Sequence, residues 1–420
     1  MTVTRLSVTE ASAHMLAGVK PLGGEDVGLG HAVGRVLARE VTSPVFLPPR
    51  DNASMDGFAV HAHDVRDAAA ARPARLRVVG TLAAGSLPTR AIEPGEAVRI
   101  MTGAYVPPGA DSVVRVEDTT SDKDIVSVLD ARDAGRNIRM RGEDVREGQV
   151  VMRAGTAIAA PHVGVLASVG CGVPHVYRKP RVAILATGDE LVLLDRFDEV
   201  RAGRRIVSSN SYALAAAVRA AGGEPVPLGI APDDPMSLAD RLREGEGCDL
   251  LLTSGGVSVG DFDYTRRVVA ELGGTLSLWR VRMRPGAPLG FGTLFGAPWV
   301  GLPGNPVSAL VTFELFGRPL VRALAGHARP HRRTVQVRLA EALQLGAPLT
   351  HFLRVVLEGD VDGIPVARLT GAQSSGMLTS MSAADALLVV PPEPQSVPAG
   401  TLLRALPLDG DLGGSDQFLA

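Results

Sequence analysis

Residues 248–274 decide the fold class of this chain. An apolar run, CDLLL, leads into the loop TSGGVSVGDFDYT (253–265) and then into RRVVAELGG, which has the pattern of a helix. A short apolar run bounded by turn residues is typical of a buried strand. A strand followed by a glycine-rich turn and a helix predicts a right-handed βαβ unit on a parallel sheet.

The same alternation of strand and helix continues around this stretch, from residue 181 to 326. RVAILATGDEL and PVPLGI predict strands, while SNSYALAAAVRAAGGE and DPMSLADRLREG predict helices. The alanine-rich helix has Ser and Asn at its start and Gly222-Gly223 at its end, which are ordinary helix boundaries. We therefore expect a mostly parallel α/β domain here, with its ligands outside the carboxyl ends of the strands.

The rest of the chain divides by composition into four stretches. Ser7 and Glu10 form a capping-box pattern, which predicts a helix that begins near Val8. Residues 48–146 hold short β-rich runs separated by Gly and Pro, whereas residues 147–180 become helical in their second half. Residues 327–420 again carry strand patterns, such as RTVQVRLA and DALLVVP. A chain of 420 residues is long for one domain and predicts two to four.

Composition excludes several classes of protein. A formal net charge of -2 argues against a general nucleic-acid binder, which is usually strongly basic. The two uncharged stretches, 159–177 and 285–313, are broken by prolines and do not predict membrane spans. Cys171 and Cys248 are the only cysteines and have no framework spacing. We expect a soluble, cytoplasmic, globular protein that binds neither nucleic acid nor membrane.

Acidic residues follow three of the predicted strands in the α/β domain, so they should meet at one edge of the sheet. They are Asp189, Glu190, Asp233, Asp234, Asp261 and Asp263. Carboxylates would repel a bound phosphate, at a cost of several kcal/mol in a poorly solvated cleft. A divalent cation such as Mg²⁺ removes that conflict by bridging the two. The alternative is that Asp233, Asp234 and Asp263 simply cap helices.

The glycines of the loop favour an anion as the ligand. Gly255, Gly256 and Gly260 could turn backbone N–H groups toward it, with the positive end of the following helix behind them. Plain tight turns are the alternative for each glycine. A P-loop is excluded because no Gly-Lys-Ser/Thr ending is present, and the spacing is not that of a dinucleotide-binding fingerprint.

Two further segments of this domain carry polar chemistry. In WRVRMRPGAPLGFG (279–292), Arg280, Arg282 and Arg284 alternate and would share one strand face, which suits an oxyanion. A charged edge strand that resists aggregation is the alternative. GLPGNPVSALVTFELF predicts a rigid turn and a helix that begins at about Pro306.

Seven segments together resemble the ordered motif set of the MoeA family, molybdopterin molybdenumtransferases that include the gephyrin E domain. The resemblance runs from about residue 5 to 405 and rests on DNASMDGFAV, RIMTGAYVPPGADSVV, NIRMRGEDV, TGDEL, TSGGVSVGDFDYT, RPGAPLGFG and LPGNPVSA. Taken alone, the turn at 48–60 and the segment 137–145 would be surface turns or ion pairs.

The resemblance implies an α/β multidomain fold. Its parts are a helical linker domain (1–47 and 147–180), an inserted β-rich domain (48–146), a MogA-like βαβ domain with a mostly parallel sheet (181–326) and a C-terminal β-barrel (327–420). It also implies a homodimer in which the second domain of one subunit faces the third domain of the other. The two subunits would then share each site.

The implied reaction inserts molybdate into adenylyl-molybdopterin with Mg²⁺ and releases AMP and molybdenum cofactor. Glu190, Asp233 and Asp263 would hold Mg²⁺, and Glu190 and Asp263 would also be catalytic. Asp56, Thr102 and Asp144 would be catalytic as well and would orient groups from the partner subunit. The implied substrate-binding residues are Arg139, Gly255, Gly256, Ser258, Gly260, Arg280, Arg284, Pro303, Asn305, Pro306 and Ser380. The adenylyltransferase that makes the substrate and molybdoenzyme chaperones are further candidate partners.

The chain also departs from the family pattern. Arg280 and Arg284 stand where lysines are common, and Ala287 stands where RPGKP or KPGKP has a lysine before its last proline, so the contact with the oxyanion should differ in geometry. Two other functions would share parts of this pattern. The adenylyltransferase shares the βαβ domain but predicts a GGTG-type loop, which is absent here. A non-catalytic scaffold would not require acids at three strand ends.

Overall fold

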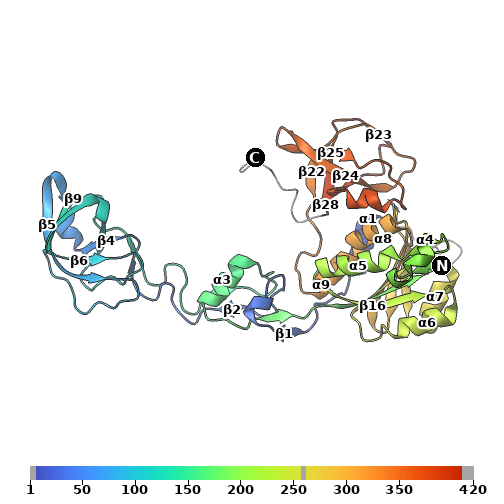
Figure 1. The fold of residues 1–420 in the computed structure, drawn as a ribbon, viewed down its shortest axis with the longest axis horizontal. Coiled ribbons are helices and arrows are strands. Elements are labelled where there is room, and N and C mark those ends of the chain that lie inside the picture. The colour runs from blue at the N-terminus through green and yellow to red at the C-terminus, as the bar shows by residue number, and fades with distance from the viewer. Residues whose placement is uncertain (1–5, 257–261, 409–420) are drawn as a thin grey trace. The chain divides into compact units, whose positions relative to one another are not determined.

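The structure is a computed structural model that describes residues 6–256 and 262–408, without the side chains of residues 262–264, 278–279 and 360–361 (Figure 1). It divides into two compact units. One comprises residues 39–154 and 160–174, and the other holds the rest of the described chain.

A six-stranded sheet forms the centre of the larger unit, in the order β16-β13-β17-β21-β20-β18. The first four strands are parallel, and the last two pair antiparallel. This confirms the mostly parallel α/β domain. The strands are β13 (Arg181–Thr187), β16 (Glu224–Ala231), β17 (Leu250–Ser254), β18 (Thr275–Arg280), β20 (Pro288–Leu294) and β21 (Ala297–Leu302).

Helices cover both faces of this sheet (Figure 1). Ile184, Leu252 and Val300 pack in one core with α5 and α8, whereas Leu185, Leu251 and Trp299 pack in a second core with α6 and α7. Burial on both faces explains why the strands are continuously apolar rather than alternating. The helices are α5 (Ser209–Ala220), α6 (Pro235–Arg243), α7 (Phe262–Glu271), α8 (Pro306–Thr312) and α9 (Arg318–Leu324).

The N-terminal helix α1 (Val8–Leu16) packs on this domain. Its start confirms the predicted capping box, because Glu10 N donates to Ser7 Oγ at 3.2 Å and Ser7 N donates to Glu10 Oε2 at 2.8 Å. Ala11 and Met15, the buried residues of α1, belong to the same core as α5 and α8.

The C-terminal strands close into a five-stranded barrel, as expected, because β24 pairs with both β25 and β26. A short strand from the βαβ domain, β19 (Met283–Arg284), adds to β24 in parallel. The barrel strands are β22 (Val335–Leu339), β24 (Thr350–Val361), β25 (Ile364–Leu369), β26 (Ala386–Val390) and β28 (Leu402–Pro407). Between them lie β23 (Leu343–Gln344), β27 (Ser396–Val397) and α10 (Leu378–Ser382).

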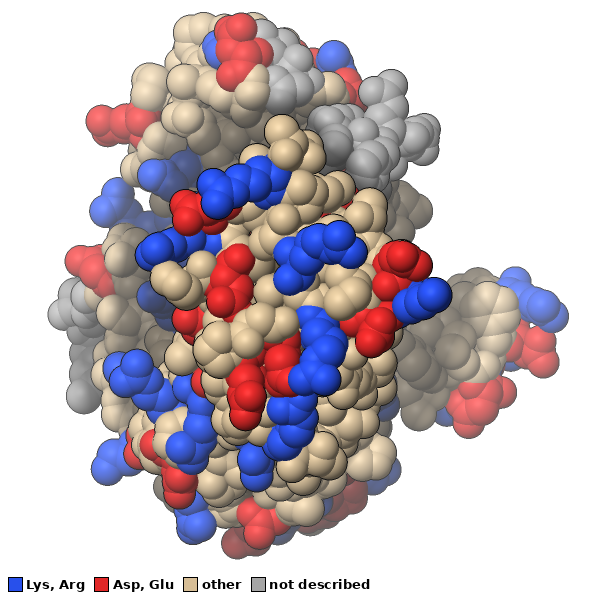
Figure 2. All heavy atoms as spheres, turned by 90° about the vertical axis from the view of Figure 1, so that its left-hand side faces the viewer, with Lys and Arg blue, Asp and Glu red and all other residues tan. Residues whose placement is uncertain are grey.

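The smaller unit is built on a second six-stranded sheet, in the order β7-β4-β6-β5-β9-β8, which confirms the β-rich domain. Its strands are β4 (Gly57–Val60), β5 (Ala69–Leu82), β6 (Glu96–Ile100), β7 (Ser112–Arg115), β8 (Thr119–Asp122) and β9 (Ile125–Asp130). Figure 2 shows acidic and basic side chains interspersed rather than segregated. Within the smaller unit, Arg77 pairs with Glu96 and Arg115 with Asp133, and both acids are buried.

Short elements complete both units. The smaller one also holds β2 (Val41–Thr42), β3 (Asn52–Ala53), α2 (Ala62–Val65), β10 (Ile138–Arg139), β11 (Val150–Met152) and α3 (Ala160–Ser168). The larger one holds β1 (Gly24–Asp26), β12 (His175–Tyr177), β14 (Leu191–Val192), α4 (Phe197–Arg201) and β15 (Ile206–Val207). Among the described residues, no helix combines the length and the apolar character needed to cross a bilayer.

Candidate functional site

A pocket of about 420 Å³ lies at the carboxyl ends of β13, β16, β17 and β21, where parallel sheets of this kind bind ligands. We call it the strand-end pocket. The residues that line it are Thr187, Gly188, Glu190, Leu191, Ile206, Val207, Ser208, Ser209, Asn210, Asp233, Ser254, Gly255, Gly256, Gly304, Asn305 and Pro306.

Six of the predicted site residues come together in this pocket. Each follows a parallel strand: Glu190 after β13, Asp233 after β16, Gly255 and Gly256 after β17, and Asn305 and Pro306 after β21. Asp234 does not line it. Its carboxylate instead accepts a hydrogen bond from Ser237 N at 2.7 Å and lies at the N-cap of α6, so capping is confirmed for this residue. That hydrogen bond from Ser237 lowers the pKa of Asp234.

The two glycines permit a close approach between the ends of β13 and β17. Gly255 and Gly256 have φ angles of +97° and +64°, which other residues rarely adopt. A Cβ on Gly255 would lie 2.5 Å from Thr187 O, and one on Gly256 would lie 2.7 Å from Thr265 Oγ1. A larger side chain at Gly255 would meet backbone, whereas one at Gly256 would displace the side chain of Thr265.

Two buried polar atoms in the pocket wall have no hydrogen-bond partner among the described residues. They are Thr187 Oγ1 and Asn210 Oδ1. The amide nitrogen of Asn210 is satisfied, since it donates to Ser254 Oγ at 2.6 Å and to Gly304 O at 2.7 Å. An unsatisfied buried polar atom costs about 1–3 kcal/mol, which a polar ligand would recover. Sequence reasoning missed both residues, although each is a polar residue at a strand end or a helix start.

The pocket suits a magnesium ion bound together with a phosphate. Mg²⁺ commonly takes one or two carboxylates and completes its shell with phosphate oxygens and water. Glu190 and Asp233 supply two carboxylates in the strand-end pocket. The side chain of Asp263, and the residues Ser258, Gly260 and Asp261, lie outside the described part of the chain. Within that part, no three His, Cys, Asp or Glu side chains converge as a metal site.

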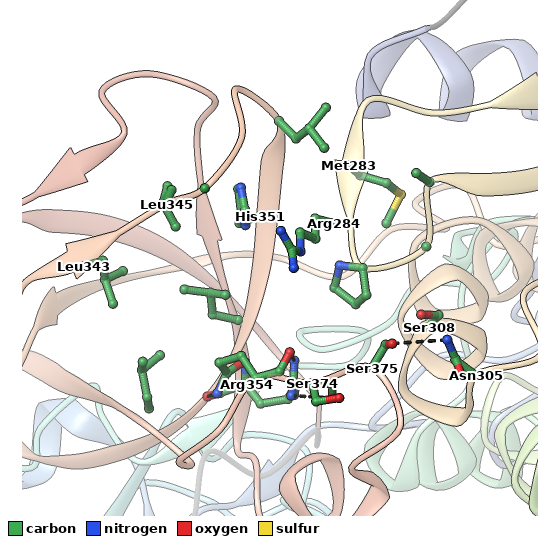
Figure 3. Close-up of a pocket in the computed structure, with 18 of the residues that line it drawn as sticks. Met283, Arg284, Asn305, Ser308, Leu343, Leu345, His351, Arg354, Ser374 and Ser375 are labelled. Atoms are coloured by element: carbon green, nitrogen blue, oxygen red, sulfur yellow. Dashed lines mark hydrogen bonds between the residues drawn. The ribbon is translucent and has the colours of Figure 1, made fainter.

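A second pocket of about 850 Å³ lies between the βαβ domain and the barrel (Figure 3). We call it the arginine pocket. One wall is the RPGAP segment, which contributes Arg284 and Ala287, and the other comes from the barrel, with His351 and Arg354. Arg284 is exposed, and no described carboxylate lies within ion-pairing distance of it.

Arg354 is the unusual residue of this pocket, because it is fully buried yet has no described carboxylate partner. Its guanidinium donates to the carbonyl oxygens of Ala372, Gln373 and Ser374 at 3.0–3.3 Å and to Ser380 Oγ at 3.1 Å. Burial lowers its pKa. Among the described residues, only dipoles therefore solvate this positive charge, which favours an anion in the adjoining cavity.

Three predicted residues of the larger unit do not line either pocket. Ser380 is buried, accepting from Arg354 and donating to Met377 O at 2.7 Å. Pro303 accepts a long contact of 3.5 Å from Ser254 Oγ through its carbonyl. Arg280 ends β18 and pairs through its backbone with Pro288. The burial of Val281 and Met283 confirms the alternation of the arginines, but Arg280 and Arg284 belong to two strands rather than one.

The four remaining predicted residues lie on the smaller unit and are exposed. Thr102 donates to Asp56 through both its backbone N–H and its hydroxyl, and Arg139 pairs with Asn52 on the neighbouring β3. Asp144 follows in the next turn, where its N–H donates to Leu47 O at 3.0 Å. The pair Asp56–Thr102 is thus brought into direct contact, while Asp144 is not in that contact.

Comparison with known proteins accounts for these features. Family models match three successive regions: the MoeA N-terminal region (domains I and II) at residues 6–170, a probable molybdopterin-binding domain at 183–323, and the MoeA C-terminal region (domain IV) at 336–408. The molybdopterin molybdenumtransferase of a Nostoc species is 39% identical over 373 residues, which cover 87% of this chain and 85% of that protein.

This chain belongs to the MoeA family. The molybdopterin molybdenumtransferase of Bacillus subtilis is 33% identical over 387 residues, with 91% of this chain and 89% of that protein covered. The crystal structure of a MoeA molybdopterin biosynthesis protein from Pyrococcus horikoshii matches with a TM-score of 0.82 at 29% identity, over 96% of this chain and all of that one. As a MoeA chain it is a transferase of molybdenum cofactor biosynthesis with a molybdopterin-binding domain.

Proposed function

We propose that the strand-end pocket binds adenylyl-molybdopterin, that the arginine pocket receives molybdate, and that the protein joins the two with release of AMP. The dithiolene sulfurs would replace one oxygen of molybdate, which leaves as water, and cleavage of the phosphoanhydride would consume one water. The observation that carries the proposal is the pairing of the two pockets: one has carboxylates and orphaned polar atoms, the other is positively charged, and both are lined by Asn305.

In the strand-end pocket, the phosphate-bearing part of the substrate would lie against Gly255 and Gly256. Thr187 Oγ1 and Asn210 Oδ1, which have no hydrogen-bond partner among the described residues, would bond polar groups of the same molecule. Glu190 and Asp233, with Asp263 as predicted, would hold Mg²⁺. The ion would offset the negative charge that develops as the phosphoanhydride is cleaved.

In the arginine pocket, attraction of the oxyanion depends on charge that the protein leaves uncompensated. Arg284 is exposed at the pocket, and the buried charge of Arg354 has no described carboxylate beside it. The positive potential of this pocket would therefore attract a dianion, even though the protein as a whole has a net charge of -2. Arg280, which lies outside the lining, would act only at longer range.

The proposed activity can be tested by AMP release from adenylyl-molybdopterin in the presence of molybdate and Mg²⁺. We expect release by the unmodified protein, loss of release on chelation of Mg²⁺, and a loss of at least about 100-fold in Glu190→Gln. Glu246→Gln, which changes an exposed glutamate remote from both pockets, is the matched control. Absence of AMP from the unmodified protein would refute the proposal.

We also propose a homodimer in which each site draws residues from both subunits. The exposed valines of the smaller unit support a protein interface there, because α3 buries only Leu166 and leaves Val165 exposed, close in sequence to exposed Val173. The exposed Asp56, Thr102, Arg139 and Asp144 would then complete the strand-end site of the partner.

The shared site has its own test. Asp56→Ala chains mixed with Glu190→Gln chains should regain up to about a quarter of the unmodified activity, since hybrid dimers would contain one intact site. Light scattering should give twice the chain mass. Inactive hybrids that nevertheless form would refute a shared site. A reducing, cytoplasmic location fits the two free cysteines, and the adenylyltransferase and molybdoenzyme chaperones are the partners we predict in the cell.

A further inference from the structure

A strongly basic loop connects α9 to β22, the first strand of the barrel. Residues 326–334 read GHARPHRRT, with three arginines, two histidines and no acidic residue. We call them the basic loop. Two further arginines, Arg318 and Arg322, lie on α9 and contact this loop. Among the described residues, Glu314 is the one carboxylate that pairs with any of these five arginines. The cluster is therefore positive within a protein whose net charge is -2.

The start of the basic loop is fixed by the way in which α9 ends. Gly326 has a φ of +85°, and its N–H donates to Ala323 O at 3.0 Å. His327 N donates to Arg322 O at 3.0 Å. These two bonds around a left-handed glycine form a Schellman motif. A Cβ on Gly326 would collide with the ring of Tyr177, so the backbone of the loop packs closely against that ring.

Two side-chain contacts hold the rest of the loop. Arg318 Nη1 donates to Pro330 O at 3.4 Å. Arg332 pairs with the carboxylate of Glu314, whose side chain is only 11% exposed. Together with the Schellman motif, these contacts fix the loop at its start, its middle and its end.

Two arginines of the loop have no counter-charge. Arg329 and Arg333 are exposed, and neither side chain forms an ion pair or a hydrogen bond with a described residue. Burial lowers the pKa of Arg318 to about 10 and also lowers the pKa of Arg322, and repulsion from Arg332 adds to both shifts. The positive charges of the cluster therefore repel one another, and a bound anion would relieve that repulsion.

The contact between Arg322 and His327 shows that the cluster excludes further positive charge. Arg322 Nη2 lies 3.1 Å from His327 Nδ1. A guanidinium can only donate, so Nδ1 accepts this bond and the imidazole is neutral, with its proton on Nε2. The surroundings of His327 thus favour the neutral imidazole and, for the same electrostatic reason, a negatively charged ligand.

We infer that the basic loop is a binding site for a phosphate group, with Arg329 and Arg333 as its direct contacts. A phosphate group carries a charge of about -1.5 to -2 and three strong acceptor oxygens, which suits several guanidinium donors better than a single carboxylate does. Arg318, Arg322 and Arg332 would raise the positive potential at the site without touching the ligand. No residue of the basic loop lines the strand-end pocket or the arginine pocket, so the inference does not depend on the proposed function.

The experiment measures the binding of inorganic phosphate to the full chain by calorimetry, in chloride buffers of constant ionic strength. We expect the double variant Arg329→Gln/Arg333→Gln to weaken the Kd of this site about tenfold or more, without a change in melting temperature. Arg72→Gln/Arg75→Gln removes two exposed arginines from the smaller unit and is the matched control, with an unchanged Kd. An unchanged phosphate isotherm in Arg329→Gln/Arg333→Gln would overturn the inference, because the phosphate would then bind elsewhere.

Two further measurements identify the source of the phosphate group and the role of the buried charge. Glycerol 3-phosphate carries the same group as an ester. If it binds at least as tightly as the free ion, the ligand is a phosphorylated molecule, whereas weaker binding identifies free phosphate. Arg318→Gln should weaken the Kd at low salt, and the difference from unmodified protein should shrink as ionic strength rises. Absence of phosphate binding to unmodified protein at low salt would also overturn the inference.

Discussion

Asp56 Oδ1 accepts two hydrogen bonds from Thr102, one from the backbone N–H and one from the hydroxyl, both at 2.7 Å. These two bonds join segments that lie 46 residues apart in the chain. The backbone bond is the larger cause of the lowered pKa of Asp56, so this carboxylate stays ionised at lower pH than an ordinary aspartate. Both residues are exposed, so their arrangement is available to a ligand.

Thr102→Ala tests this pair. Loss of the hydroxyl donor should leave the Asp56 carboxylate less well oriented, and we expect AMP release to fall about tenfold with little change in melting temperature, since the pair is exposed. Thr102→Ser keeps the donor and should retain activity. Full activity in Thr102→Ala would remove the pair from the site.

Gly255→Ala should damage the strand-end pocket. The new Cβ would lie 2.5 Å from Thr187 O on a backbone with φ +97°. We expect a loss of about 2–4 kcal/mol in the free energy of unfolding, measured by urea denaturation. Gly172→Ala, where a Cβ meets no atom within 4 Å, should change it little. Equal stability in the two variants would contradict the close approach of β13 and β17.

Ala287→Lys should strengthen the attraction for molybdate. Ala287 lines the arginine pocket beside Arg284, and an added ammonium would raise the positive potential there. We expect the KM for molybdate to fall about three- to tenfold at low salt, with the effect shrinking as ionic strength rises. A KM that is unchanged at every salt concentration would place the oxyanion elsewhere.

His327 should make the stability of the protein depend on pH. Burial, with Arg322 and Arg318 nearby, lowers the pKa of His327 from 6.5 to about 4. Between these values the unfolded chain binds a proton that the folded chain does not, so the free energy of unfolding should fall as pH drops from about 6.5 to about 4. Below pH 4 this contribution should level off.

The comparison of unmodified protein with His327→Gln isolates this effect. Burial also raises the pKa of Glu314 in the same cluster. That shift makes the free energy of unfolding rise as pH falls, which is opposite to the effect of His327. Both proteins contain Glu314, so its contribution cancels in the comparison. Urea midpoints measured from pH 4 to 8 should therefore differ in slope only below about pH 6.5. Parallel curves would show that His327 has the same pKa in the folded and the unfolded chain, and would contradict its lowered pKa.

The strand-end pocket was largely predictable from the sequence because it obeys local rules. Apolar runs followed by polar turns mark where parallel strands end, and such ends meet at one edge of the sheet. The sequence pattern alone therefore places Glu190, Asp233 and Gly255 together. The sequence could not tell that Asp234 caps a helix while Asp233 lines the pocket. Both roles use an aspartate at the turn between a strand and a helix.

The arginine pocket was not predictable in the same way. Its walls come from segments as far apart as Arg284 and Ser375, and only the closure of the barrel brings them together. Arg354 lies within the strand pattern HFLRVVLEG, where an arginine would ordinarily face solvent. Its burial depends on the backbone carbonyl groups of the loop at residues 372–374. Every residue has such a group, so the sequence does not indicate that these three accept hydrogen bonds from Arg354.

The parallel pairing of β19 with β24 has a mechanical consequence. Met283 pairs with Thr350 and Arg284 with His351, and Thr350 N donates to Arg282 O at 3.2 Å, so the two walls of the arginine pocket share one backbone ladder. Any rotation of the barrel away from the βαβ domain would have to break the backbone pairing of β19 with β24. We therefore expect molybdate to enter and leave through a pocket opening of fixed width. The rate of its uptake should depend on the width and charge of that opening and not on a hinge motion between the two domains.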